Sequence, residues 1–184
     1  MSHWDRSDPV SDEELVRRAR GGEEAALGAL VRRHADAVYR VALAIAGDPD
    51  VAQDVSQDAF LKAFRALGGF RGDAAFRTWL LTIAANAARG ALRRQGRRKE
   101  TELEAVPSIA SDERGPDEAT ELSSESARAR AALARLPEKQ RLSVQLRVDE
   151  GLSFREIAEV VGSTEGAARV NYFHGVRKLR EWMQ

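Results

Sequence analysis

Apolar residues recur every three or four positions along most of the first hundred residues, a spacing that places them on one face of a helix. The stripe comprises Leu15, Ala19, Ala26, Leu30 and Val31, then Val38, Val41, Ala42 and Ile45, and further on Val51, Val55, Ala59 and Phe60. No segment alternates apolar and polar residues between turn signals, as a half-buried strand would. We therefore predict an all-α fold.

Capping residues and glycines divide this stripe into separate helices. Ser11 and Glu14 have the spacing of a capping box, and the helix that they begin is interrupted at Gly21-Gly22. Further helices are predicted from Val38 to Gly47, from the N-cap Asp48 and the following Pro49 to Gly68-Gly69, and from Phe76, after Asp73, to about Arg94.

Residues 152–180 have the pattern of a helix-turn-helix. Ser153 caps the first helix, Glu156 completes a capping box, and Gly162 lies in the short turn. Another helix is predicted just before them, over residues 137–151. The last helix is basic towards its C-terminal half, which favours a helix that enters the major groove of DNA. A helical hairpin that binds protein is the alternative, because spacing alone does not separate the two.

The formal charge is zero, with 29 basic and 29 acidic side chains, and a neutral chain would argue against a nucleic-acid partner. The charge is unevenly distributed, however: residues 1–99 carry +4, residues 100–126 carry −8 and residues 127–184 carry +4. The middle segment contains two prolines, five serines and no aromatic residue, so it buries too little apolar surface to fold alone. We predict an N-terminal tail (1–10) and two small helical domains, 11–99 and 127–184, joined by an acidic flexible linker over residues 100–126.

The composition excludes several classes of protein. Without cysteine, the chain forms no disulfide, thiolate metal site or thiol redox sensor. It has no apolar run of about 18 residues and no signal-peptide pattern at its start, so we expect a cytoplasmic protein without membrane contact of its own. The three histidines, His3, His34 and His174, are scattered, and no nucleophile–base pair or phosphate loop is visible. We expect neither an enzyme nor a cofactor.

Residues 82–99 carry six basic side chains and no acidic one, whereas a solvated face usually mixes both signs. Phe70, Phe76 and Trp79 lie just upstream, around a glycine-rich loop. Aromatic rings beside a basic track can stack on unpaired bases, so we interpret this segment as a surface that captures a single DNA strand. The alternative is that Phe76 and Trp79 simply belong to the core.

An acidic cluster lies before it. Asp48, Asp50, Asp54 and Asp58 fall within eleven residues that contain no Lys or Arg. The N-cap and the helix dipole account for the first two, but Asp54 and Asp58 are four residues apart, where carboxylates repel on a helix. This indicates a basic partner surface, and a merely solvated face is the alternative. No histidine or third acid lies nearby at helical spacing, so no metal site is expected.

Together these features resemble a bacterial sigma factor of the sigma-70 family. Region 2 of the extracytoplasmic-function (ECF) group is similar to three segments, DEELVRRARGGEEAALGALVRRH, VYRVALAIAGDPDVAQDVSQDAFLKAFRAL and FRTWLLTIAANAARGALRRQGRR. Region 4 is similar to ALARLPEKQRLSVQLRVDEGLSFREIAEVVGSTEGAARV. The resemblance implies a protein that binds core RNA polymerase through its β′ and β subunits, directs it to promoter DNA, helps to melt the duplex and is controlled by an anti-sigma factor.

The resemblance also implies three sets of site residues. Contact with the β′ coiled coil of the polymerase is expected from Asp50, Gln53, Asp54, Gln57, Asp58 and Leu61. Recognition and melting of the −10 element is expected from Phe70, Arg71, Trp79, Asn86, Arg89, Arg93, Arg94 and Arg97, with the loop 68–74 holding a flipped base. Recognition of the −35 element is expected from Thr164, Glu165, Arg169, Val170, Phe173, His174 and Arg177.

Some positions depart from the family pattern. Ala85 and Gly90 stand where the family often has Arg and Asp, and Asn171 and Val176 replace arginines of the recognition helix. Gly175 weakens that helix by up to ~1 kcal/mol relative to Ala. These changes leave the fold intact and bear on the promoter sequence. The alternative function is a stand-alone helix-turn-helix regulator, which would bind duplex DNA without the polymerase.

Overall fold

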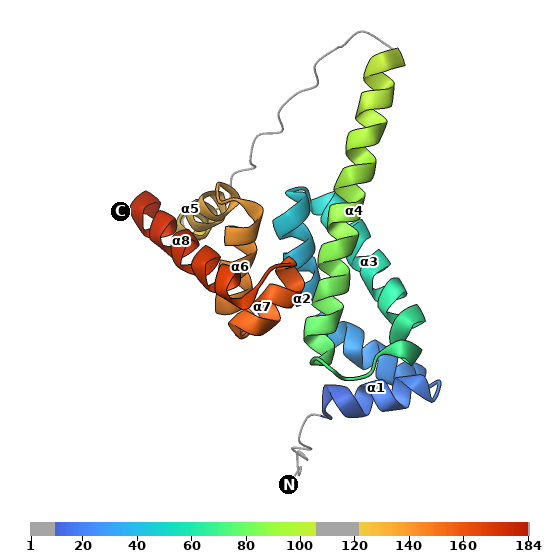
Figure 1. The fold of residues 1–184 in the computed structure, drawn as a ribbon. Coiled ribbons are helices and arrows are strands. Elements are labelled where there is room, and N and C mark those ends of the chain that lie inside the picture. The colour runs from blue at the N-terminus through green and yellow to red at the C-terminus, as the bar shows by residue number, and fades with distance from the viewer. Residues whose placement is uncertain (1–9, 106–121, 184) are drawn as a thin grey trace.

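The computed structural model describes residues 10–105 and 122–183, which contain helices and no strand, as predicted (Figure 1). The N-terminal unit consists of α1 (Asp12–Arg20), α2 (Glu24–Ala46), α3 (Pro49–Ala66), the 3-10 turn η1 (Leu67–Gly69) and α4 (Phe76–Ala105). The C-terminal unit consists of α5 (Leu122–Ala134), α6 (Glu138–Val148), α7 (Phe154–Val161) and α8 (Glu165–Met183).

The predicted N-caps are confirmed. The Ser11 hydroxyl accepts a hydrogen bond from the backbone N–H of Glu14 at 3.3 Å, and the Asp48 carboxylate accepts two from the first turn of α3. Ser153 and Glu156 form a complete capping box, with each side chain bonded to the other residue's backbone N–H. These bonds satisfy donors that the first turn of a helix leaves free, so local sequence fixes where α1, α3 and α7 begin.

The helix boundaries differ from prediction at three places. The segment from Val38 is not a separate helix but the second half of α2, because nothing between Val31 and Val38 breaks a helix. At the other two places, α4 continues to Ala105 and α5 begins at Leu122, so both ends of the predicted linker 100–126 are helical. A helix that has already formed can be extended without a new nucleation step. The composition of residues 100–126 therefore does not show where the neighbouring helices end. The rest of the linker, 106–121, lies outside the described residues, as does most of the tail 1–10.

The core runs without interruption through both units. Leu30 of α2 and Leu81 of α4 are fully buried in the N-terminal unit, and Leu142 of α6 and Ile157 of α7 join the same apolar cluster. Helix α7 packs on α4 and α6 packs on α2, so the two units lie directly against each other (Figure 1). The two units therefore share one apolar interface.

A glycine sets the distance between α6 and α8. A Cβ atom on Gly175 would lie 2.7 Å from Val144 Cγ2 and 3.3 Å from the Gln140 carbonyl oxygen. Real Cβ atoms do not approach that closely, so only glycine allows α8 to cross α6 here. The lower helix propensity of Gly175 is thus offset by close packing.

Candidate polymerase and promoter interfaces

The predicted polymerase-binding residues lie on one face of α3, at helical spacing. Asp50, Gln53, Asp54 and Gln57 are exposed, Asp58 is half-buried, and Leu61 is 55% exposed, which is high for a large apolar side chain. Asp58 accepts a 2.6 Å hydrogen bond from Lys62 Nζ, so part of the predicted carboxylate repulsion is relieved within the helix.

This face adjoins a groove between α3 and α4 that carries both signs of charge. Asp54 and Asp58 line one side, and Arg94 and Arg98 of α4 line the other. The resemblance places Arg94 on the −10 surface, and in the structure this residue lines the groove opposite the carboxylates of α3. The acidic surface is therefore bordered by cations that reduce its field.

The remaining −10 candidates on α4 follow one side of the helix. Trp79, Asn86, Arg93 and Arg97 recur at spacings that successive turns bring into line, and Arg89 lies beside them. Asn86, Arg93 and Arg97 are exposed. A continuous strip of cations and one amide on a straight helix is suited to a phosphate backbone.

The aromatic residues at the start of α4 divide into core and surface. Phe76 is 2% exposed, which settles it as core, whereas Phe70 and Trp79 are half-buried. The ring centroids of Phe70 and Trp79 are 4.9 Å apart, so the two rings form one partly open apolar surface. Arg20 of α1 bonds the carbonyls of Leu67 (3.0 Å) and Phe70 and thereby anchors this turn, a role that its sequence context does not reveal.

The loop between η1 and α4 contains an exposed ion pair. Arg71 and Asp73 form an ion pair of 3.3 Å, with side chains 83% and 77% exposed. Gly72 between them has φ +81°, a left-handed conformation that glycine adopts without strain. Arg71 is thus presented to solvent next to the Phe70–Trp79 surface.

Arg89 is the exception among the −10 candidates, because it is already bound. Its Nε donates to Glu138 Oε1 at 2.9 Å, while Nη1 and Nη2 point to the carbonyls of Val160 (3.5 Å) and Val161 (3.3 Å). All three acceptors belong to the C-terminal unit. The guanidinium thus has an acceptor for each of its three nitrogens inside the protein.

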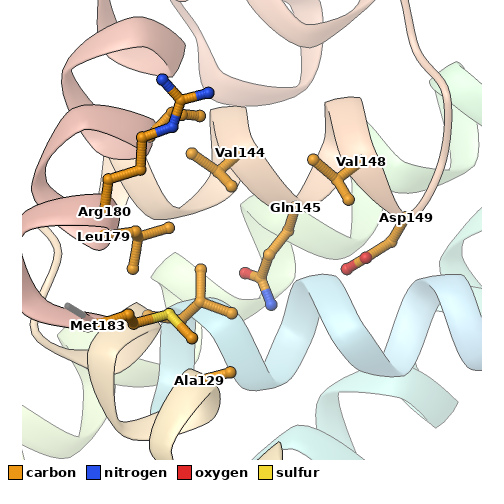
Figure 2. A pocket seen from close by; sticks show the side chains of 10 residues that line it. Ala129, Val144, Gln145, Val148, Asp149, Leu179, Arg180 and Met183 are labelled. Carbon is orange, nitrogen blue, oxygen red and sulfur yellow. The ribbon is translucent and has the colours of Figure 1, made fainter.

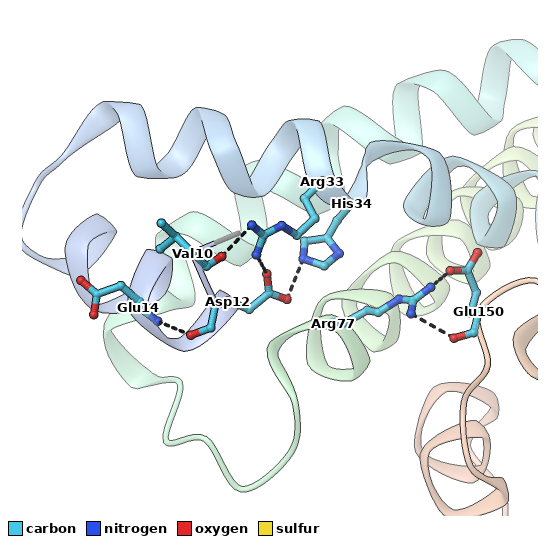
Figure 3. A network of polar contacts seen from close by, with 8 residues as sticks. Val10, Asp12, Glu14, Arg33, His34, Arg77 and Glu150 are labelled. Atoms are coloured by element: carbon cyan, nitrogen blue, oxygen red, sulfur yellow. Dashed lines mark hydrogen bonds and ion pairs between the residues drawn. The ribbon is translucent and has the colours of Figure 1, made fainter. Parts of the chain in front are cut away.

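A second polar contact joins the two units through Glu150, in the turn after α6 (Figure 3). Its side chain is 3% exposed and accepts from Arg40 Nε of α2 at 2.9 Å. Arg77 of α4 forms an ion pair with the same carboxylate and donates to the Glu150 carbonyl at 2.9 Å. Burial and the charge of Arg40 both lower the pKa of Arg77. Sequence reasoning missed this buried triad.

His34 of α2 lies close to this triad and is buried, at 4% exposure (Figure 3). Its Nε2 is 2.8 Å from Asp12 Oδ2, and Arg33 donates to Asp12 Oδ1 at 2.6 Å. Burial lowers the pKa of His34, and the neighbouring carboxylate only partly opposes this. His34 is therefore a structural residue that ties α1 to α2 in its neutral form.

The residues predicted to recognise the −35 element, on and just before α8, are all exposed. This holds for Thr164 at its N-terminus and for Glu165, Arg169, Val170, Phe173, His174 and Arg177. Ala168 and Gly175 point into the core instead. Arg169 pairs with Glu165 at 3.2 Å, and its guanidinium carbon lies 5.2 Å from the centre of the Phe154 ring. These two contacts hold the guanidinium of Arg169 in one orientation.

An apolar groove opens on the far end of the C-terminal unit, between α5, α6 and α8 (Figure 2). Its volume is about 370 Å³, and its apolar lining comes from Ala129, Leu133, Val144, Val148, Val176, Leu179 and Met183. Val148 is 66% exposed and Met183 48%. Neither the groove nor α5, which forms one of its walls, was predicted from the sequence.

Within residues 10–105 and 122–183, no helix has the length and apolar content needed to cross a bilayer.

Comparison with known families gives two matches: residues 30–98 match Sigma-70 region 2, and residues 126–179 match Sigma-70, region 4.

Known proteins resemble the chain over nearly its full length. The RNA polymerase sigma-H factor of Pseudomonas aeruginosa is 34% identical over 181 residues, which cover 94% of each chain. The ECF RNA polymerase sigma-E factor of Escherichia coli K12 is 35% identical over 175 residues, or 91% of each chain.

Two solved structures have the same fold. CnrH, in complex with the cytosolic domain of CnrY, superposes with a TM-score of 0.69 and 27% identity over 94% of this chain and 96% of that one. The sigma factor RpoE of Bartonella quintana, in complex with the anti-sigma factor NepR, has a TM-score of 0.68 over 85% of this chain and 95% of its own. At 20% identity, this second likeness concerns the fold alone. The chain belongs to the extracytoplasmic-function group of the sigma-70 family: it is an ECF sigma factor, a protein of transcription initiation.

Proposed function

We propose that this sigma factor binds core RNA polymerase through α3 and brings it to promoters whose −10 and −35 elements are bound by α4 and α8. The observation that carries the proposal is the presence of two exposed, basic helix faces on separate helical units. One DNA molecule with two spaced elements requires such a pair of surfaces. A stand-alone regulator that binds DNA through the C-terminal unit leaves the strip on α4 without a role.

Core binding is assigned to the exposed face of α3. Asp54 and Gln57 supply hydrogen-bond acceptors, and Leu61 supplies an apolar centre that water otherwise surrounds. A basic coiled coil of the β′ subunit would pair with the carboxylates and cover Leu61. Contact with β would come from the C-terminal unit.

Melting is assigned to the strip on α4 and the loop before it. The cations Arg93 and Arg97 would hold the phosphates of one strand, and Asn86 would contact a base edge. The half-buried rings of Phe70 and Trp79 offer a face on which an unpaired base can stack, beside the loop with Arg71. In this role the described residues supply positions and charges, and we propose that the chain assists melting without catalysis of its own.

Reading of the −35 duplex is assigned to α8. Its N-terminal turn, with Thr164 and Glu165, would reach base edges in the major groove, as in other helix-turn-helix proteins. Arg169 would donate to a guanine, and Val170 and Phe173 would contact thymine methyl groups. The exposure of Val170 and Phe173, 54% and 58%, supports this assignment because a monomeric protein gains nothing by leaving them in water.

Control by an anti-sigma factor is proposed at the groove between α5, α6 and α8. The groove is apolar at its floor and has Asp149 and Arg180 at its rim, which suits an amphipathic helix. The occupant that we propose is a helix of an anti-sigma factor. That this fold can bind a second protein is supported by CnrH, which was solved in complex with the cytosolic domain of CnrY. The sigma factor itself would then work in the cytoplasm.

Run-off transcription tests the proposal. The protein is added to core RNA polymerase on a library of genomic promoter fragments, and the transcripts are sequenced. We expect discrete start sites that share two spaced elements and that require both proteins. Asp54→Lys should abolish these transcripts, whereas Glu24→Lys, with the same charge change on the exposed start of α2, should not. Equal DNA affinity with and without core polymerase would favour the stand-alone regulator and overturn the proposal.

A further inference from the structure

We propose that Arg20, the last residue of α1, is a positioning residue for the capture of an unpaired −10 base, because it fixes the turn that carries the Phe70 ring. This inference rests on the proposed function of the Phe70–Trp79 surface, on which such a base would stack. Arg20 is not among the residues that the resemblance assigns to polymerase or DNA. It acts on the base only through Phe70.

The guanidinium of Arg20 is used differently from those of its neighbours on α1. Arg17 and Arg18 both form ion pairs with nearby glutamates. Arg20 has no acidic partner among the described residues; instead its Nε donates to the Leu67 carbonyl at 3.0 Å, and its Nη2 donates to the Phe70 carbonyl. Because the donors of a guanidinium form a rigid, planar fork, the two carbonyls are held in a fixed arrangement.

The turn that Arg20 holds has little else to fix it. It is the three-residue 3-10 helix η1, and two of its residues are Gly68 and Gly69, which lose more backbone freedom on folding than other residues. Its backbone makes one bond to the next residue, from the Phe70 N–H to the Leu67 carbonyl at 3.2 Å. Hydrogen bonds from a charged donor are stronger than neutral ones, so the two bonds from Arg20 restrict the turn more than this backbone bond does.

The position of the turn decides where the Phe70 ring lies. The centre of this ring is 4.9 Å from that of Trp79 and 5.8 Å from that of the buried Phe76, within the range of favourable aromatic pairs. The guanidinium carbon of Arg20 lies 6.0 Å from the same ring centre. Phe76 and Trp79 belong to α4 and are held by that helix, whereas the place of Phe70 depends on the turn. A base that stacks on both Phe70 and Trp79 therefore needs the turn to be fixed.

Arg20 is not needed for the packing of α1 itself. The buried face of this helix consists of Leu15, Val16 and Ala19, whereas Arg20 is exposed. Loss of the guanidinium leaves these apolar contacts in place. We therefore expect local loosening of the turn and not unfolding of the N-terminal unit.

The first measurement uses the full chain without DNA or polymerase. Amide hydrogen exchange, followed by NMR, reports opening of the bond from the Phe70 N–H to the Leu67 carbonyl. In Arg20→Gln this exchange should be at least about fivefold faster than in the parent protein, and the amides of α8 should be unchanged. Arg17→Gln removes the same charge from α1 but breaks only a pair within that helix, so exchange at Phe70 should equal that of the parent. Equal exchange in Arg20→Gln and the parent would overturn the inference.

The second measurement tests base capture. Holoenzyme is titrated with the non-template strand of the −10 element from a promoter found by run-off transcription, and with copies that each lack one base. In the parent, the copy that loses most affinity identifies the stacked base. Arg20→Gln should bind the intact strand at least about fivefold more weakly than the parent does but should bind the copy without that base equally well. Arg20→Lys, which keeps a charged donor, should lie between the two, and Arg17→Gln should match the parent.

The outcomes separate this inference from the proposed function. Equal weakening of Arg20→Gln on the intact strand and on the copy without the stacked base would mean that Arg20 does not act through the base, and this would overturn the inference. A parent holoenzyme that binds every copy as tightly as the intact strand would overturn the proposed stacking on Phe70 and Trp79 instead. The exchange measurement would still decide whether Arg20 fixes the turn.

Discussion

Arg89 of α4 and Glu138 at the start of α6 are 49 positions apart in the chain and form an ion pair of 2.9 Å between the two helical units. One residue belongs to the face proposed to hold the −10 strand, and the other belongs to the unit proposed to read the −35 element. The pair therefore links the two units that are proposed to bind DNA. It also allows the proposed role of Arg89 in DNA binding to be tested separately from its role in the fold.

The first prediction uses this pair. Arg89→Ala should lower the rate of promoter opening by about tenfold, because a charged hydrogen bond to a phosphate contributes ~1.5–3 kcal/mol. Glu138→Gln also breaks the pair but leaves the cation in place, so opening should be unaffected or faster. Opening is followed by fluorescence of a base analogue in the −10 element with core polymerase present. Equal losses in both variants would mean that the pair matters for folding and not for DNA.

The second prediction concerns the acidic face of α3. Asp54→Lys should weaken binding to core polymerase by at least about tenfold, since a like charge replaces one partner of a charged contact. Binding is measured by fluorescence anisotropy of the labelled sigma factor. Glu24→Lys is the control for overall charge. Unchanged affinity in Asp54→Lys would mean that the acidic face of α3 does not contact the polymerase.

The third prediction concerns the recognition helix. Arg169→Ala should reduce binding of the −35 duplex by holoenzyme and relax the base preference at one position, at a cost of ~1–3 kcal/mol. Lys178→Ala is the matched control, because this residue lies on the opposite side of α8. Core binding should be normal in both variants. Uniform weakening over all sequences would make Arg169 a phosphate contact and not a base reader.

Local sequence was sufficient for much of the fold. Capping at Asp48 and Ser153 and the turn at Gly162 depend on bonds within a few residues, so their positions follow from the chain itself. The exposed face of α8 follows from helical period for the same reason. Resemblance to the ECF group added the roles that we propose for these faces.

The rest depends on contacts between distant segments. Glu150 is bonded to residues 73 and 110 positions away, and nothing in the sequence around it distinguishes it from the neighbouring Asp149. The same holds for Arg94, whose place beside Asp54 depends on how α3 packs on α4. Charge counts state the net sign of each segment but identify no partner for any side chain.

The fourth prediction concerns pH. Burial puts the pKa of His34 in the folded protein below its ordinary value of about 6.5, despite Asp12 beside it and with Arg33 and Arg77 opposing protonation. The unfolded chain then binds more protons at mildly acidic pH. The contribution of His34 to the free energy of unfolding should therefore be constant above about pH 6.5. Below about pH 6.5, the free energy of unfolding should decrease as the pH falls. Urea titrations followed by tryptophan fluorescence at pH 7.5 and 5.5 measure this.

His34→Gln should remove most of this fall, because glutamine keeps a hydrogen-bond donor near Asp12 and does not titrate. His174 on α8 is exposed, and His174→Gln serves as the control, which should retain the fall. An equal pH dependence in His34→Gln and the parent protein would refute the role assigned to His34.

The last prediction concerns the two kinds of glycine in the long helices. Gly175→Ala should destabilise the protein, although alanine is the better helix former, because its Cβ would lie 2.7 Å from Val144 Cγ2 and 3.3 Å from a backbone carbonyl. Overpacking of this kind costs ~1–3 kcal/mol and exceeds the gain in helix propensity of up to ~1 kcal/mol. Gly96→Ala in α4 is the control: no atom lies within 4 Å of its added Cβ, so this change should stabilise the protein. Urea titration of both variants measures whether each change raises or lowers the free energy of unfolding. If both variants gain stability, α6 and α8 can separate at little cost, and Gly175 does not set their distance.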